Sequence, residues 1–223
     1  MRKRFVFSLF LLSFLANSQT FNQEYANVSN LVSQSNINSY LEEFEALGVK
    51  TTGSTANNNA YTWLKNKYLS FGYTENDISK DNFTYNGQST SSIIVTKQGT
   101  KYPNIYVIVC GHYDTIVGTG TNDNGSGVSV ILETARLLKN IPTEYSIKFI
   151  NFSGEEQGLL GSAHYVSSVV NATSPKMNIR LVLNIDEVGG IKGQTNDTVT
   201  CEIDESNSPS ANNAASNTFT QQL

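Results

Sequence analysis

The chain has 223 residues, of which 39% are hydrophobic and 10% aromatic, so it can bury one sizeable core and is not a disordered protein. Only 15% of the residues are charged, and the formal net charge at pH 7 is −4. This mildly acidic balance comes without a basic cluster, so we expect no nucleic-acid partner.

The first 18 residues have the layout of a cleavable secretory signal peptide. Basic residues open the chain, an apolar stretch covers residues 5–16, and the small residues Ala16 and Ser18 suit a cut directly after Ser18. The alternative is a membrane anchor, but this stretch is shorter than the roughly 20 residues that a spanning helix needs. We therefore expect residues 1–18 to be a signal peptide. Residues 19–223 would then be one exported domain, secreted or periplasmic, with no membrane association after cleavage.

The chain contains two cysteines, Cys110 and Cys201. Export permits a disulfide, but two cysteines do not make a disulfide-stapled scaffold. Because Cys110 ends an apolar run, we expect it to be a small buried core residue. We do not predict a bond between the two.

The first half of the chain is predicted to form two helices followed by a strand. Apolar residues recur at helical spacing over 37–47, and a second amphipathic pattern runs over 56–71. Residues 72–90 are polar and rich in turn-forming residues, with a short strand expected near Phe83. The β-branched residues that follow predict a strand over 92–96.

Three later runs are short, mostly apolar and rich in β-branched or aromatic residues, namely 105–110, 147–152 and 179–185. Helical patterns over 128–138 and 159–166 separate them. This alternation predicts an α/β fold with a mixed sheet that is parallel at its centre and has helices on both faces.

Several acidic residues and one histidine lie where these strands end or a helix begins. In chain order they are His112, Asp114, Asp123, Glu155, Glu156 and Asp186. Ligands of open α/β sheets bind beyond the carboxyl ends of the strands, so we expect these side chains to converge at one edge. One imidazole and several carboxylates suit a zinc site.

The spacing of the first residues suggests their roles. His112 and Asp114 are two positions apart, so along a strand both point to one face. His112 is then a metal ligand, and the carboxylate behind it fixes the tautomer of the ring. Asp123 has two oxygens and can bridge two metals, although Asp123-Asn124-Gly125 read alone favours an ordinary turn.

Glu155 and Glu156 are adjacent, so their side chains should point in different directions. One can bind metal while the other accepts a proton from metal-bound water. Paired carboxylates in an apolar context are costly to bury, which argues against a plain solvated surface. Asp186 can complete the shell of the first metal, whereas Glu187 fits a supporting or surface position better.

From about Ile37 to Asp186 the chain resembles the co-catalytic di-zinc aminopeptidases of the leucyl-aminopeptidase type, whose fold is shared by the transferrin receptor and glutaminyl cyclases. The matching segments are Thr52-Gly53-Ser54, 111–115, 122–127, 152–162 and Asn184-Ile185-Asp186. The resemblance implies a zinc-exopeptidase, phosphorylase/hydrolase-like sandwich with two Zn²⁺ ions. It implies His112 and Asp186 on one zinc, Glu156 on the other, and Asp123 bridging. It further implies Glu155 as general base, Asp114 behind His112 and often a cis peptide after Asp123.

The chain departs from the family towards its C-terminal end. In the family a histidine well downstream of the last aspartate completes the second zinc shell, and here the only histidine besides His112 is His164. His164 falls in a predicted helix and is expected to be an ordinary helix residue. The last elements expected are a strand over 198–203 and a helix starting near 208. We therefore expect a C-terminally truncated domain, lacking that histidine, which by itself binds zinc poorly and turns over little.

The function that the resemblance implies is a zinc-dependent aminopeptidase that hydrolyses N-terminal peptide bonds with a metal-bridging water and Glu155 as the base. Peptide or protein N-termini would be its substrates. Three alternatives stay open: a carboxypeptidase of the same superfamily, a glutaminyl cyclase-like enzyme, or a non-catalytic binding module if the chain truly ends at Leu223. The preferred N-terminal residue and the oligomeric state do not follow from the sequence.

Overall fold

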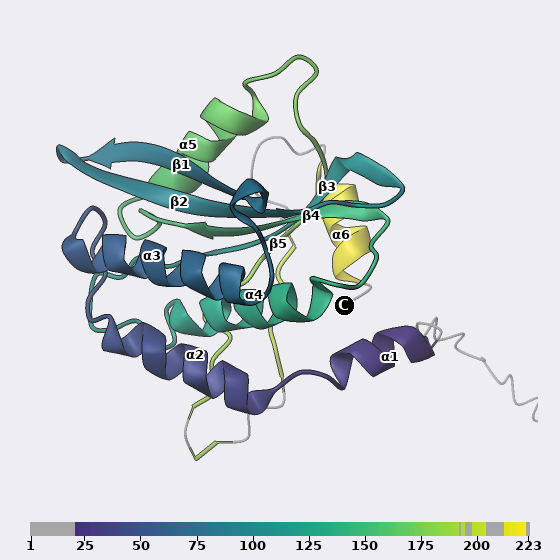
Figure 1. Ribbon diagram of the computed structural model, residues 1–223, viewed down its shortest axis with the longest axis horizontal. Helices are drawn as coiled ribbons and strands as arrows, with labels where there is room; N and C mark the ends of the chain where they lie inside the picture. The colour runs from purple at the N-terminus through teal and green to yellow at the C-terminus, as the bar shows by residue number, and fades with distance from the viewer. Residues whose placement is uncertain (1–20, 192, 195–197, 204–211, 222–223) are drawn as a thin grey trace, which may run out of the picture. The chain divides into compact units, whose positions relative to one another are not determined.

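The computed structural model describes residues 21–191, 193–194, 198–203 and 212–221 (Figure 1). The expected signal peptide over 1–18 lies outside these residues. Within the described part, none of the helices combines the length and the hydrophobicity that crossing a bilayer requires.

The chain divides into two units, of which residues 28–198 form the larger. The described part of the smaller unit contains α6 (Asn213–Thr220) and most of α1 (Gln23–Ser29). A helix is thus present near the C-terminus, as expected, while positions 208–211, where it was expected to start, lie outside the described residues. The strand expected over 198–203 is wrong, because those residues have no regular structure and pair with no strand of the described sheet.

A five-stranded mixed sheet forms the middle of the larger unit, in the order β1-β2-β4-β3-β5. In chain order the strands are β1 (Ile78–Tyr85), β2 (Gln88–Lys97), β3 (Tyr102–His112), β4 (Tyr145–Phe152) and β5 (Asn178–Asn184). The strands β4, β3 and β5 run parallel to one another, whereas β2 is antiparallel to both of its neighbours, β1 and β4. The predicted α/β class and its parallel centre are confirmed.

The hairpin of β1 and β2 is longer than the sequence pattern predicts. Tyr85 pairs with Gln88 across the two-residue turn of Asn86 and Gly87, both of which have positive φ angles of 47° and 76°. That conformation matches the twist of the strands that it joins. The strand β1 is an edge strand with mostly exposed or half-exposed side chains, so its sequence lacks the apolar run that reveals a buried strand.

Helices cover both faces of the sheet (Figure 1). The helices α2 (Gln34–Ala46), α3 (Thr55–Ser70) and α4 (Gly125–Leu138) lie on one face, and α5 (Leu160–Tyr165) with the short π-helix η2 (Val166–Val170) lies on the other. The first three begin at Ser33, Ser54 and Asn124, whose side chains accept a hydrogen bond from a backbone N–H of the first turn.

Two hydrophobic clusters hold these layers together. The larger lies between the sheet and α2, α3 and α4, and includes Phe44, Ile131 and Phe149. The smaller packs beneath α5 and includes Tyr165 and the predicted core residue Cys110. Both cysteines are free thiols. Because buried residues fill β2, β3 and β4, the carboxyl ends of β3 and β4 project from a rigid base.

Candidate metal centre

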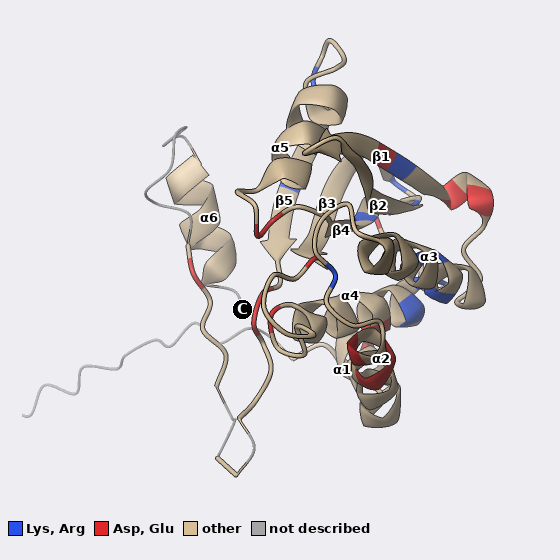
Figure 2. Ribbon diagram, turned by 90° about the vertical axis from the view of Figure 1, so that its left-hand side faces the viewer, with Lys and Arg blue, Asp and Glu red and all other residues tan. Residues whose placement is uncertain are grey.

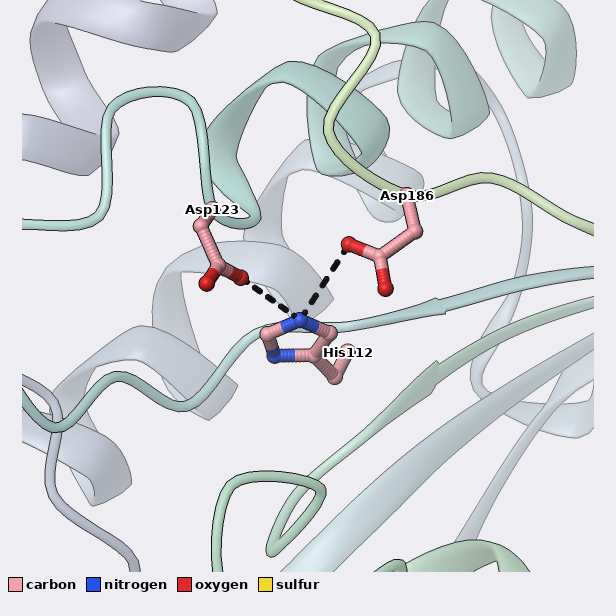
Figure 3. A group of neighbouring side chains, drawn as sticks. All are labelled: His112, Asp123 and Asp186. Carbon is pink, nitrogen blue, oxygen red and sulfur yellow. Dashed lines mark ion pairs between the residues drawn. The ribbon is translucent and has the colours of Figure 1, made fainter. Parts of the chain in front are cut away.

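Three residues from separate elements converge at the carboxyl ends of the parallel strands (Figure 3). His112 is the last residue of β3, Asp123 lies in the loop before α4, and Asp186 follows β5. The Nε2 atom of His112 is 3.0 Å from an oxygen of Asp123 and 3.5 Å from an oxygen of Asp186. One ligand atom from each lies within 4.8 Å of the other two.

This donor set fits a zinc ion. Ligand atoms that lie 2.0–2.2 Å from a tetrahedral zinc are roughly 3.4 Å from one another. The two distances from His112, 3.0 Å to Asp123 and 3.5 Å to Asp186, are close to that value, and an imidazole with two carboxylates is a donor set that zinc accepts.

Asn124 ties the loop that carries Asp123 to the segment that carries Asp186. Its buried amide donates to the carbonyl oxygen of Ile185 at 2.9 Å, and its Oδ1 accepts from the N–H groups of Gly127 at 3.0 Å and Glu187 at 3.3 Å. The peptide bond between Asp123 and Asn124 is cis, as the resemblance implied. Sequence reasoning missed this role of Asn124, since nothing in its local pattern distinguishes a clamp from a turn.

The ring of His112 is held in the orientation that metal binding needs. Its side chain is 3% exposed, and Nδ1 lies 3.1 Å from the backbone carbonyl oxygen of Asp114. A carbonyl can only accept, so Nδ1 carries a hydrogen, and Nε2, which faces Asp123 and Asp186, is the nitrogen left to bind a metal. We expected the carboxylate of Asp114 to contact Nδ1, but its nearer oxygen is 3.7 Å away, and the backbone carbonyl oxygen of Asp114 makes the contact instead.

The buried carboxylate of Asp114 instead holds the segment that follows β4. It accepts hydrogen bonds from the N–H groups of Glu155 at 3.1 Å and Glu156 at 3.2 Å, and from the hydroxyl of Thr52 at 3.2 Å. Its side chain is fully buried. Asp114 thus links the strand that carries His112 to the two glutamates, a connection that the sequence pattern alone does not reveal.

Glu155 and Glu156 follow β4 after a sharp turn at Gly154, whose φ angle is 78°. The pKa of Glu155 is raised, mainly by burial. His112 acts in the opposite direction, but the carboxylates of Asp114, Asp186 and Asp123 add to the rise. Burial and Asp123 likewise raise the pKa of Glu156. The site therefore gathers more negative charge than the chain alone neutralises, which favours a bound cation.

The negative charge of these carboxylates also raises the pKa of His112. Burial lowers it, but the nearby carboxylates of Asp114, Asp186 and Glu155 outweigh burial and raise it to about 9. Figure 2 shows acidic segments gathered near the ends of β3 and β5. In the metal-free protein the His112 ring is therefore protonated at neutral pH, and its positive charge faces the carboxylates.

Glu156 lies beside this group and not within it. It lines, together with Asp123, a pocket of about 630 Å³ whose other walls are the residues of the loop 116–122. In that loop Ile116 and Val117 have exposed fractions of 46% and 88%. The pocket therefore opens next to the candidate metal ligands.

His164 lies apart from the metal group. It is part of α5, where its Nδ1 is 3.0 Å from both carboxylate oxygens of Asp81 and its ring stacks on Phe83. Its contacts are those of a residue that joins α5 to β1.

Comparison with known proteins identifies the family. Residues 92–222 match the model of "Peptidase family M28", and because the match covers more than half of the chain, the chain belongs to this family. A 108-residue stretch is 43% identical to aminopeptidase YwaD of Bacillus subtilis and covers 47% of this chain and 23% of that protein. A "probable zinc metalloprotease" of Pyrenophora tritici-repentis is 27% identical over 207 residues, covering 79% of this chain and 46% of that protein.

Solved structures show the same fold. The LapA aminopeptidase of Legionella pneumophila superposes with a TM-score of 0.63 and 25% identity over 78% of this chain and 50% of that one. Glutaminyl cyclases share the fold at 17–22% identity. The chain thus spans half or less of the length of the YwaD, Pyrenophora and LapA proteins that it matches.

Proposed function

We propose that the protein is a zinc-dependent metallo-aminopeptidase that hydrolyses the first peptide bond of peptide or protein substrates. The observation that carries the proposal is the meeting of His112, Asp123 and Asp186 within 4.8 Å of one another. Membership of peptidase family M28 and relatives named as aminopeptidase and zinc metalloprotease support it.

In the complete site His112 and Asp186 would hold one zinc ion, Glu156 would hold a second, and Asp123 would bridge the two. Bound zinc supplies two things, a lowered pKa for water and a polarised substrate carbonyl. The backbone clamp of Asn124 and the ring orientation of His112 keep these ligands in place before any ion binds.

Glu155 is the residue for proton transfer. Its raised pKa lies closer to neutral pH than that of an ordinary carboxyl group. Such a pKa suits a base that takes a proton from water and returns it to the leaving amine. Asp114 fixes its position by accepting its backbone N–H. Glu155 and Asp114 therefore act as one unit, one moving the proton and the other holding the peptide segment.

Relatives named as aminopeptidases favour a free amino terminus over a free carboxyl terminus as the substrate end that is recognised. Asp123 and Glu156 line the pocket, but as zinc ligands their charge would be balanced by the metal and would not by itself select a substrate end. The proposal thus favours an aminopeptidase over a carboxypeptidase. A glutaminyl cyclase needs one metal, so the carboxylates around Asp123 argue for hydrolysis instead.

Export of the protein is part of the proposal. A signal peptide over 1–18 would be removed, and a mature domain from residue 19 would act outside the cytoplasm, in secreted or periplasmic form. N-terminal sequencing of protein recovered from its host tests this directly. A mature end at Gln19 supports export, and an intact Met1 contradicts it.

The experiment that tests the activity compares three matched peptides with the full-length protein and zinc. The peptides share one sequence and differ in a free N-terminus, an acetylated N-terminus or an N-terminal Gln. Stepwise loss of N-terminal residues from the peptides with a free N-terminus, and none from the acetylated peptide, is the expected result. Loss from the C-terminus indicates a carboxypeptidase, cyclised Gln indicates a cyclase, and no reaction with zinc bound indicates a binding module.

A further inference from the structure

Lys50 is a buried lysine for which the proposed chemistry has no role. Its exposed fraction is 0%, which is rare for a lysine unless its charge is compensated. Its Nζ donates to three backbone carbonyl oxygens, those of Gly48 at 2.7 Å, Thr119 at 2.8 Å and Phe44 at 3.2 Å. The hydrogen bonds of this buried ammonium group thus all go to backbone carbonyl groups.

The position of Lys50 is fixed from several directions. Its Nζ lies 3.8 Å from the centroid of the buried Phe44 ring, close enough for a cation–π contact. Its backbone N–H donates to the hydroxyl of Thr115 at 2.8 Å, and its carbonyl accepts from the N–H of Thr115 at 3.3 Å. The amide of Asn57 also donates to that carbonyl at 3.4 Å. The ammonium group is therefore a rigid anchor point.

The Lys50 ammonium group holds the loop between β3 and α4. Thr119 belongs to the loop 115–124, which begins beside Asp114 and carries Asp123. The middle of this loop is open to solvent, since Val117 is 88% exposed. The bond from Lys50 to Thr119 joins that open stretch to the buried core at a point four residues before Asp123.

We propose that Lys50 is a positioning residue of the metal centre, whose ammonium group binds the Thr119 carbonyl and thereby sets the loop that carries Asp123. The inference rests on the proposed function only in treating Asp123 as a metal ligand. A neutral side chain at position 50 takes away the ammonium donor of the Gly48 and Thr119 carbonyl oxygens, whereas the Phe44 carbonyl keeps the N–H of Leu47 as a donor. The Thr119 carbonyl is the one that can turn to water, because its loop is open, and that movement shifts Asp123.

The test compares Lys50→Met with Lys97→Met in the full-length protein. Lys97 is a matched control because it is also buried, with 8% exposed, but its Nζ binds the hydroxyl of Thr143, which lies outside the candidate site. Zinc affinity is measured by competition with a chromogenic chelator. Hydrogen exchange of residues 116–124 is measured without metal, and melting temperatures report general stability.

We expect Lys50→Met to weaken zinc binding by about tenfold or more, within the range for residues that support metal ligands. Exchange over 116–124 should be faster in the same variant. Lys97→Met should lower the melting temperature and leave zinc affinity and loop exchange unchanged. Lys50→Arg keeps the charge and its donors, so it should bind zinc more tightly than Lys50→Met.

Wild-type zinc affinity and loop exchange in a folded Lys50→Met variant would overturn the inference. So would an equal loss of affinity in Lys97→Met, because the effect would then be one of stability alone. If the wild-type protein binds no zinc, the proposed function fails, while loop exchange still decides whether Lys50 anchors the loop. If Lys50→Met does not fold, Lys50→Gln, which keeps an amide donor of shorter reach but no charge, is measured in its place. Faster exchange of the loop in that variant supports the anchor, and unchanged exchange contradicts it.

Discussion

The candidate site has an inner half and an outer half that are built differently. The side chains of His112 and Asp114, the inner half, are 3% and 0% exposed, and protein hydrogen bonds fix both. The side chains of Asp123 and Asp186, the outer half, are 47% and 41% exposed. The inner half is therefore part of the folded core, whereas the outer half brings together like charges that an ion would stabilise. Substitutions should separate these two roles.

The largest expected effect is on turnover, at the glutamate that the inner half holds. Glu155→Gln keeps the backbone N–H that Asp114 binds but removes the base. The hydrolysis rate should fall by about 10²- to 10⁴-fold, the usual contribution of a general base, while zinc stays bound. Initial rates and metal content measured on the same samples check this. Retained activity would remove Glu155 from its role.

An outer-half substitution should abolish tight zinc binding while the fold keeps most of its stability. Asp186→Asn removes one ligand charge, so zinc affinity should fall by more than the roughly 100-fold upper range for supporting residues. The metal-free protein should keep most of its stability, because the lost attraction to His112 is offset by relief of the repulsion from Asp123 and the Asp186 side chain is 41% exposed. Glu187→Gln is the matched control next in sequence and should bind zinc as the wild type does. Chelator competition and thermal melting with chelator give both quantities.

An inner-half substitution should affect metal and fold together. In Asp114→Asn the amide nitrogen meets backbone N–H groups that need an acceptor. Zinc affinity should fall by roughly 10- to 100-fold, and the metal-free protein should lose about 1–3 kcal/mol of unfolding free energy. Urea titrations of the metal-free proteins measure the second effect. If Asp114→Asn and Asp186→Asn destabilise the fold equally, the distinction between the two halves is wrong.

The last expected effect leaves the metal ligands unchanged and is a pH dependence of stability from Lys50, which contacts Thr115 next to the inner half. Burial lowers the pKa of Lys50 from 10.5 to about 8. Between these values the unfolded chain binds more protons than the folded protein, so the contribution of Lys50 to stability rises with pH, by at most about 1.4 kcal/mol per pH unit. Lys50→Arg stays charged throughout and should lack this rise. Parallel urea titrations of the two proteins from pH 8 to 10 show whether their difference in stability changes with pH.

The sequence predicted the elements whose side chains carry a strong pattern. The apolar runs that became β3, β4 and β5 were placed correctly, and with them the ends at which His112, Glu155 and Asp186 lie. The edge strand β1 was mostly missed because its exposed faces carry polar residues. A strand over 198–203 was wrong because alternation alone does not supply a pairing partner.

Supporting contacts of the site could not be predicted in the same way. That Asp114 meets His112 through its carbonyl and the glutamates through its carboxylate depends on how two strands lie side by side. The clamp of Asn124 on Ile185 and the anchor of Lys50 on Thr119 join residues 61 and 69 positions apart. Such links follow from tertiary structure and leave no local pattern.

The most direct test of the account is the zinc content of the full-length protein after gel filtration, measured by mass spectrometry beside its Asp186→Asn variant. We expect the wild-type protein to retain zinc, at about one ion or more per chain, and the variant to lose it while eluting and melting as a folded protein. Equal zinc content in the two, or none in a folded wild-type protein, would contradict a metal centre built from His112, Asp123 and Asp186.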